Sequence, residues 1–161
     1  MPLLFQPVQL NLLELKSFCI AVLAFIFTTW IVYLFNDIWD QKRDVQNISK
    51  QHKVLVQHPN LRVPALILLI VFGALLIFMT LSLEQGFTIL IAGYFLINIV
   101  YTLWVKNILC LDVLCVASGF TIRYGYGALL FLVSFDVLLA GTITFLALFL
   151  VLCKRKKDKM N

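Results

Sequence analysis

The run SFCIAVLAFIFTTWIVYLF at residues 17–35 is followed at once by NDIWDQKRD at residues 36–44. The first run contains no charged residue, and at 1.5 Å per helical residue it is long enough to cross most of a hydrocarbon layer about 30 Å thick. The second run is rich in aspartate. This order predicts a membrane-spanning helix with a cluster of carboxylates at its end.

The spacing of Asp37, Asp40 and Asp44 is i, i+3 and i+7. On a helix these side chains form one stripe, within about 60° around the axis and ~10 Å along it. Like charges on one stripe repel one another, and a bound Mg²⁺ would remove that repulsion because it prefers carboxylate, water and phosphate oxygens. The alternative is a solvated loop of mixed charge, since Lys42 and Arg43 lie in the same run. The spacing alone leaves both interpretations open.

The whole chain has the composition of an integral membrane protein. Of its 161 residues 62% are apolar and 13% are charged, and the mean hydropathy is +0.99. Backbone polar groups inside a bilayer must be satisfied within the chain, so we expect an all-α, polytopic transmembrane helical bundle. About five spans are predicted, at residues 17–35, 63–83, 85–105, 108–130 and 137–153.

Basic residues are unevenly distributed over the predicted connections. In a five-span arrangement the segment 36–62, the turn at Lys106 and the tail 154–161 share one side of the membrane and carry most of the lysines and arginines. The positive-inside rule places this side in the cytoplasm, with the chain in the inner (plasma) membrane. The net charge of +5 therefore reflects orientation and binding of lipid or phosphate, and it gives no indication of nucleic acid.

Two further features suggest polar chemistry. Arg123 falls inside the fourth apolar stretch, about three turns and ~16 Å beyond Asp112, and an arginine inside a membrane usually faces a cavity or a partner. It could instead pair with a helix-end carbonyl or extend to the far surface. The tail, with Lys154 and Arg155, is either a simple orientation signal or a group of phosphate ligands.

Four separated stretches together resemble a known family. The pattern NDxxDxxxD is matched in full by Asn36, Asp37, Asp40 and Asp44. Partial matches follow at residues 47–54, 101–123 and 154–158. On these four stretches the chain resembles the UbiA superfamily of intramembrane prenyltransferases, in the branch related to decaprenyl-phosphate phosphoribosyltransferase.

The later matches are less complete than the first. In the branch, NDxxDxxxD is usually followed by HPxKxxRP, of which residues 47–54 retain Lys50 and have Lys53 in place of an arginine. Residues 101–123 are similar to YxLxxK, LDVL and AxGFxLR, and residues 154–158 resemble KRxxE with Asp158 in place of the glutamate.

The resemblance implies a transferase that acts on polyprenyl substrates by Mg²⁺-dependent displacement of diphosphate. The reaction would be prenyl transfer from an isoprenoid diphosphate, or phosphoribosyl transfer to a polyprenyl phosphate. The metal ligands and catalytic residues would be Asp37, Asp40 and Asp44. The diphosphate would be bound by Asn36, Lys50, Lys53, Lys154 and Arg155. The cavity wall would include Asp112 and Arg123.

The resemblance also implies a larger bundle, because family members have about nine transmembrane helices. We therefore expect residues 1–161 to form a single, incomplete UbiA-like domain, with a cytoplasmic loop at 36–62 carrying the Asp motif and a basic tail at 154–161. The alternative is a non-catalytic truncated remnant or partner subunit, completed by a second copy or by another chain. The short length leaves the activity of this chain by itself open.

Overall fold

The computed structural model describes residues 12–160, apart from the side chains of residues 12–14, 107, 109–110 and 154–160. All regular structure within that range is helical, which confirms the all-α prediction. The α-helices are α1 Leu12–Asp44, α2 Val54–Gln57, α3 Arg62–Thr80, α4 Gln85–Leu103, α5 Leu109–Leu130 and α6 Val137–Met160. The short 3₁₀ turns are η1 Ile48–Lys50, η2 Pro59–Leu61 and η3 Val105–Asn107.

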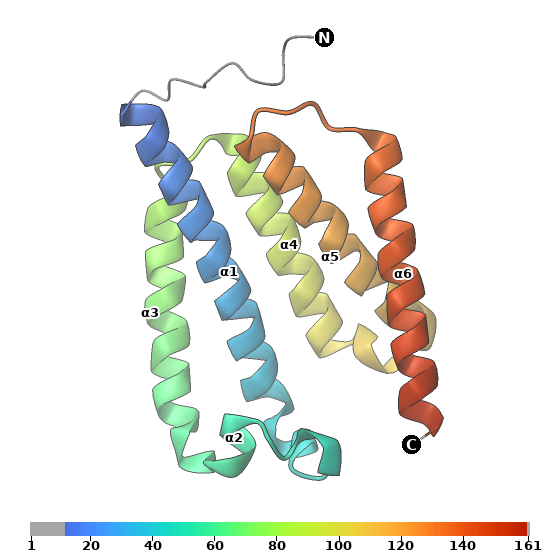
Figure 1. Cartoon of the computed structure of the whole chain (residues 1–161). Helices are drawn as coiled ribbons and strands as arrows, with labels where there is room; N and C mark the ends of the chain where they lie inside the picture. The colour runs from blue at the N-terminus through green and yellow to red at the C-terminus, as the bar shows by residue number, and fades with distance from the viewer. Residues whose placement is uncertain (1–11, 161) are drawn as a thin grey trace.

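Four helices of the described chain are long and apolar enough to cross a membrane. They are Leu15–Asp44, Pro59–Thr80, Gln85–Leu103 and Leu111–Leu130. The apolar part of α6, Val137–Cys153, is shorter, although α6 runs alongside α5 over much of its length (Figure 1). The protein is an integral membrane helical bundle, and four of the five predicted spans meet the length expected of a crossing.

The helices form an antiparallel arrangement whose two ends differ (Figure 1). α1 packs against α3 and α4, α4 against α5, and α5 against α6. The connections α3–α4 and α5–α6 lie at one end, whereas residues 45–61, η3 and the end of α6 lie at the other. We call the latter the polar end, because it holds the segment that carries Lys50 and Lys53 and the turn that carries Lys106.

Small side chains let α1 approach its neighbours closely. Ala21, Ala24 and Thr28 recur on one face of α1 and are at most 1% exposed. Small residues at helix contacts are typical of membrane bundles, in which packing rather than the hydrophobic effect holds helices together. The hydroxyl of Tyr126 on α5 donates to the carbonyl of Ala21 at 2.7 Å. α1, α4 and α5 therefore enclose the interior of the bundle.

The structure corrects one boundary of the predicted loop at 36–62. α1 does not end near Phe35 but continues to Asp44, so the Asp motif is helical and only residues 45–61 connect α1 to α3. Lysines neutralise the acidic stripe that would otherwise weaken this helix. Lys42 and Arg43 in the last turn also suit the negative end of the helix dipole.

Candidate functional site

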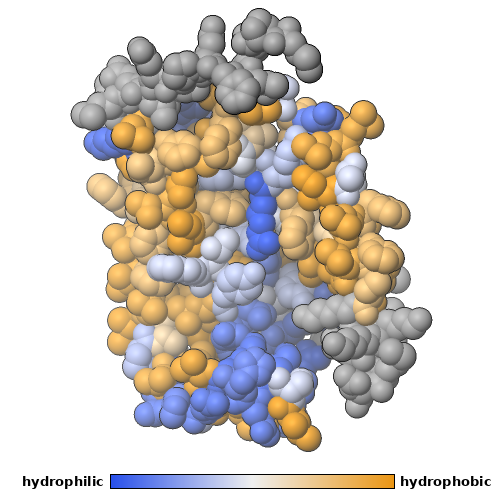
Figure 2. Space-filling model, in the orientation of Figure 1, coloured by the Kyte–Doolittle hydropathy of each residue, from blue (hydrophilic) through white to orange (hydrophobic). Residues whose placement is uncertain are grey.

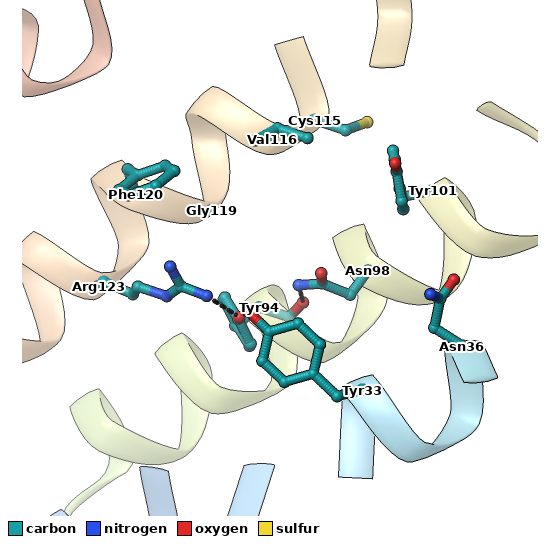
Figure 3. A pocket seen from close by; sticks show the side chains of 10 residues that line it. All are labelled: Tyr33, Asn36, Tyr94, Asn98, Tyr101, Cys115, Val116, Gly119, Phe120 and Arg123. Carbon is teal, nitrogen blue, oxygen red and sulfur yellow. Dashed lines mark hydrogen bonds between the residues drawn. The ribbon is translucent and has the colours of Figure 1, made fainter. Parts of the chain in front are cut away.

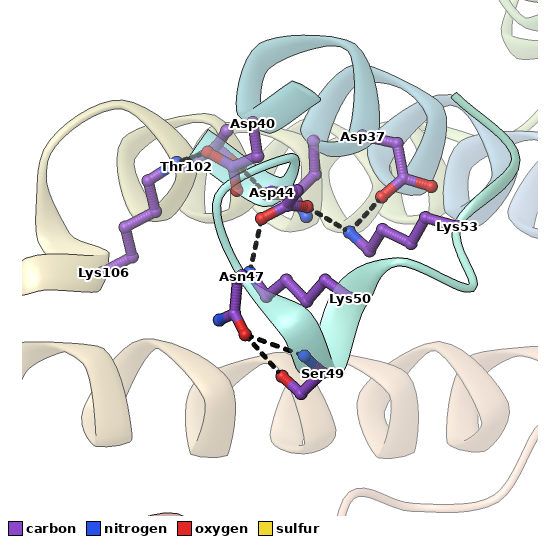
Figure 4. Close-up of polar contacts among 10 residues, drawn as sticks. Asp37, Asp40, Asp44, Asn47, Ser49, Lys50, Lys53, Thr102 and Lys106 are labelled. Atoms are coloured by element: carbon purple, nitrogen blue, oxygen red, sulfur yellow. Dashed lines mark hydrogen bonds and ion pairs between the residues drawn. The ribbon is translucent and has the colours of Figure 1, made fainter. Parts of the chain in front are cut away.

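Three carboxylates and three ammonium groups meet at the polar end (Figure 4). Lys53 Nζ donates to Asp37 Oδ1 at 2.5 Å and to Asp44 Oδ2 at 2.8 Å. Lys50 Nζ donates to Asp44 Oδ1 at 2.7 Å, and Lys106 Nζ donates to Asp40 Oδ1. We call these residues the acid–lysine cluster: Asp37, Asp40, Asp44, Lys50, Lys53 and Lys106. Its formal charges cancel.

The cluster is buried to different depths. Asp44 is 1% exposed and Asp40 is 7% exposed, whereas the side chain of Asp37 is 39% exposed. Burial by itself lowers the pKa of Lys53, but the hydrogen bonds and charges of Asp37 and Asp44 outweigh it and hold that pKa above its ordinary value. Lys53 is therefore a permanent cation between two carboxylates at neutral pH.

The segment 45–61 folds back on α1 and delivers two of the lysines. Asn47 accepts from the backbone N–H and the hydroxyl of Ser49, which caps η1. Gln41, which is 6% exposed, donates to the carbonyl of Leu55 at 2.8 Å and holds α2 against α1. These contacts set Lys50 and Lys53 opposite the acidic stripe. The third lysine, Lys106, comes from η3 between α4 and α5.

Asn36 links the cluster to the interior of the bundle. It precedes Asp37 on α1, and its Oδ1 accepts from the hydroxyl of Thr102 on α4 at 3.3 Å. Thr102 is 1% exposed, so this contact lies inside the helix packing. Asn36 also lines a pocket between the helices, which brings the motif and the pocket into contact.

The pocket has a volume of about 340 Å³ and lies between α1, α4 and α5 (Figure 3). Arg123 and Phe120 lie at one end, and Asn36 and Tyr101 lie at the other. Figure 2 shows hydrophilic residues gathered at the polar end and continuing into a hollow between hydrophobic surfaces. The full lining is Tyr33, Asn36, Tyr94, Asn98, Tyr101, Cys115, Val116, Gly119, Phe120 and Arg123.

Arg123 is held in this pocket by aromatic residues. Its Nη2 donates to the Tyr94 hydroxyl at 2.7 Å. The guanidinium carbon lies 5.4 Å from the centre of the Tyr94 ring and 5.2 Å from that of the Phe120 ring, within the range of cation–π attraction. Arg123 therefore faces a cavity, as one of its two sequence interpretations requires.

The other predicted site residues are placed differently. Asp112 is buried in the first turn of α5, about three turns from Arg123, and it is not among the residues that line the pocket. The side chains of Lys154 and Arg155 lie outside the described residues. The described part of the site thus unites six predicted residues, Asn36, Asp37, Asp40, Asp44, Lys50 and Lys53, and sets Arg123 at the far end of the adjoining pocket.

The oxygen donors of the cluster suit a magnesium ion. Lys53 Nζ lies within 2.8 Å of oxygens of both Asp37 and Asp44, so these two carboxylates already share one cation. Within the described chain, no three Asp, Glu, His or Cys side chains are grouped as ligands of one ion. Mg²⁺ commonly needs only one or two carboxylates, with waters and substrate phosphates as its other ligands. The pair Asp37 and Asp44 meets that requirement.

Sequence reasoning missed Lys106, Thr102 and Tyr94 as parts of the site. The sequence marks Lys106 as a charge in a turn and as the lysine of the YxLxxK match, without a role in the site, and its pairing with Asp40 spans 66 residues. A signal was available for Lys106, since a basic residue in a short turn on the same membrane side as the Asp motif can reach it. Thr102 and Tyr94 gave no signal, because an apolar helix commonly contains such residues as packing groups.

Comparison with known proteins gives one clear match. The sequence model of the UbiA prenyltransferase family matches residues 8–158, nearly the whole chain. No curated protein and no solved structure matches the chain.

Proposed function

The chain belongs to the UbiA prenyltransferase family, and from this premise we propose that it is a membrane transferase that displaces diphosphate at the acid–lysine cluster. Its substrates are polyprenyl lipids. The observation that carries the proposal is that the carboxylates of NDxxDxxxD lie on one helical stripe, each paired with a lysine, beside a pocket in the bundle that Asn36, Asn98 and Arg123 help to line.

Mg²⁺ is the proposed cofactor, and Asp37, Asp40 and Asp44 would hold it; Asp37 and Asp44 already share one cation, the ammonium of Lys53. When bound, the metal ion would act as a Lewis acid that stabilises the negative charge of the leaving diphosphate. Asn36 would orient the neighbouring carboxylates through its contact with Thr102.

The lysines have a second role in this proposal. In the structure Lys50, Lys53 and Lys106 neutralise the carboxylates. When cation and diphosphate arrive together, the lysines exchange carboxylate partners for phosphate oxygens, where charge-assisted hydrogen bonds stabilise the departing group. The burial of Asp40 and Asp44 strengthens these interactions because little water competes.

Two reactions use this site in the same way. The carbon that loses diphosphate belongs to an isoprenoid in prenyl transfer, and to ribose in phosphoribosyl transfer to a polyprenyl phosphate. The retained Lys50 and the stretch 101–123 support the branch related to decaprenyl-phosphate phosphoribosyltransferase. We place the cluster on the cytoplasmic side of the inner (plasma) membrane, because its end of the bundle carries the basic connections.

The test is incorporation of label in membranes that contain the chain, with and without Mg²⁺. Labelled phosphoribosyl diphosphate and labelled prenyl diphosphate are supplied in parallel, and the proposal predicts Mg²⁺-dependent transfer to lipid from one of them. Asp37→Ala and Asp40→Ala should abolish both the transfer and Mg²⁺-dependent binding of substrate. Unchanged binding in both variants would remove the site assignment, and no transfer from either substrate would favour the non-catalytic alternative.

A further inference from the structure

Arg123 is a permanent cation placed deep in an apolar bundle. It lies seven residues, or about 10 Å of helix, before Leu130 at the end of α5. Among the described residues no carboxylate forms an ion pair with it. Its hydrogen-bond partner, the Tyr94 hydroxyl, is uncharged. A charge in such a place is costly unless it is compensated, and it commonly marks a ligand site.

The surroundings of Arg123 leave room for a ligand. A guanidinium has five N–H donors in a planar fork, and the Tyr94 hydroxyl accepts from Nη2. The pocket of about 340 Å³ falls at the lower end of the size range of small-molecule sites. Figure 3 shows the guanidinium extending toward the pocket interior, with Tyr33 from the opposite helix near Tyr94. Aromatic rings hold the cation in place and leave its net charge uncompensated.

We propose that Arg123, with Tyr94 and Tyr33, forms a binding subsite for an oxyanion, of the phosphate monoester type, carried by a ligand that occupies this pocket. A planar fork that matches two oxygens of one anion is the group best suited to this recognition. The subsite is separate from the acid–lysine cluster: Tyr94 and Tyr101, which line opposite parts of the pocket, are seven residues and about 10 Å apart along α4.

The geometry also gives the ligand a direction. An anion at Arg123 leaves the rest of the ligand extending past Asn98 toward Asn36, where the pocket meets the Asp motif. That the ligand is a substrate rests on the proposed function, whereas binding of the oxyanion does not. A lipid-borne phosphate and a soluble phosphate share the chemistry that Arg123 recognises, and binding measurements distinguish these two sources.

The test uses the full chain in phosphatidylcholine nanodiscs without divalent cations. The probes are farnesyl monophosphate, its uncharged counterpart farnesol, and inorganic phosphate. Wild type should bind the monophosphate at least about tenfold more tightly than farnesol, because one charge-assisted contact is worth that ratio. Arg123→Gln should make the two affinities equal, and Arg123→Lys should fall between. Displacement of the monophosphate by inorganic phosphate at equal concentration would indicate a soluble ligand, and its failure a lipid-borne one.

The matched control is Lys53→Gln, which removes a cation from the acid–lysine cluster but not from the pocket. It should leave the preference for the monophosphate intact. If Lys53→Gln abolishes that preference while Arg123→Gln retains it, the anion binds at the cluster and the inference is overturned. Mg²⁺-dependent substrate binding by wild type and Asp37→Ala is measured separately, so failure of this subsite and failure of the proposed function give different results.

A second measurement needs no substitution at Arg123. Cys115 is a half-buried free thiol that lines the pocket, whereas Cys19 is exposed. Farnesyl monophosphate should slow alkylation of Cys115 in wild type at concentrations at which farnesol does not, and alkylation of Cys19 should stay unchanged. Equal protection of Cys115 by both compounds would show that the phosphate adds nothing to binding and would overturn the inference.

Discussion

At the residue scale, Lys53 holds the position that most affects how the site works. Its ammonium lies between Asp37 and Asp44, at 2.5 and 2.8 Å from their oxygens, where a metal ion shared by the two carboxylates would also lie. A lysine and a divalent cation therefore compete for the same carboxylates. A diphosphate ion relieves this competition, because it offers the displaced lysine a new anionic partner.

This competition predicts opposite effects of one substitution on two affinities. Lys53→Gln should bind Mg²⁺ alone at least about tenfold more tightly than wild type, a gain of about 1.4 kcal/mol or more in binding free energy. The neutral side chain neither repels the dication nor holds the two carboxylates by charge. The same variant should bind Mg²⁺ with pyrophosphate more weakly, because it lacks the ammonium group that would donate a hydrogen bond to a phosphate oxygen. Both affinities can be measured by titration calorimetry on purified protein.

The control for this experiment is Lys42→Gln, at an exposed lysine in the last turn of α1. It removes the same charge at the same polar end of the bundle without touching the acid–lysine cluster, so both affinities should stay within about twofold of wild type. Weaker binding of Mg²⁺ alone by Lys53→Gln would contradict the competition and assign Lys53 a purely structural role.

At the element scale, α1 carries both the packing face of the bundle and the Asp motif. Ala24 is 0% exposed and Leu23, the next residue toward the N-terminus, is 45% exposed, so adjacent positions face the core and the lipid. Ala24→Phe should lower the free energy of unfolding by about 1–3 kcal/mol, because a well-packed core has no space for the added ring. Leu23→Phe should change it by less than about 0.5 kcal/mol. Unfolding in mixed micelles would measure both.

Equal destabilisation by the two substitutions would contradict this assignment of faces. A smaller effect at Ala24 than at Leu23 would mean that α1 is rotated about its axis. Such a rotation would also turn Asp37, Asp40 and Asp44 away from their lysines, because all these residues lie on one continuous helix. The stability of the packing face therefore tests the geometry of the site.

The same helix shows how far the sequence could predict the structure. Hydropathy predicted the position of α1 because a bilayer requires a long apolar helix. The spacing of the aspartates predicted that they share one stripe, provided that their segment is helical. The extension of α1 to Asp44 could not be predicted from the sequence. The choice between a helix and a solvated loop at residues 36–44 depended on whether distant lysines neutralise the acidic stripe. That depends on the fold of residues 45–61 and on Lys106, which no local pattern specifies.

At the scale of the whole molecule, the two ends of the bundle differ in charge and in role. The polar end brings together the acid–lysine cluster and the basic connections, while the α3–α4 and α5–α6 connections lie at the other end (Figure 1). The pocket lies between these two ends of the bundle and extends from Asn36, in the Asp motif, to Arg123. A substrate with an apolar tail can then remain in the membrane while its polar group reaches the cluster, which suits a transferase of lipids.

This arrangement makes a prediction about membrane sidedness that three exposed serines can test. Ser49 lies at the polar end, and Ser82 and Ser134 lie in the two connections at the opposite end. Each is replaced singly by cysteine, a change of one side-chain atom, in a chain whose native cysteines are alanine. The native cysteines are Cys19, Cys110, Cys115 and Cys153.

A membrane-impermeant thiol reagent should label Ser82→Cys and Ser134→Cys in intact cells, and Ser49→Cys only after the membrane is opened. The reason is the excess of lysine and arginine at the polar end, which keeps that end in the cytoplasm during insertion. Labelling of Ser49→Cys in intact cells would place the cluster outside, away from cytoplasmic diphosphate substrates, and would overturn the proposed orientation. Opposite labelling of Ser82→Cys and Ser134→Cys would instead mean that α4 and α5 do not both cross, which would separate Arg123 from the Asp motif.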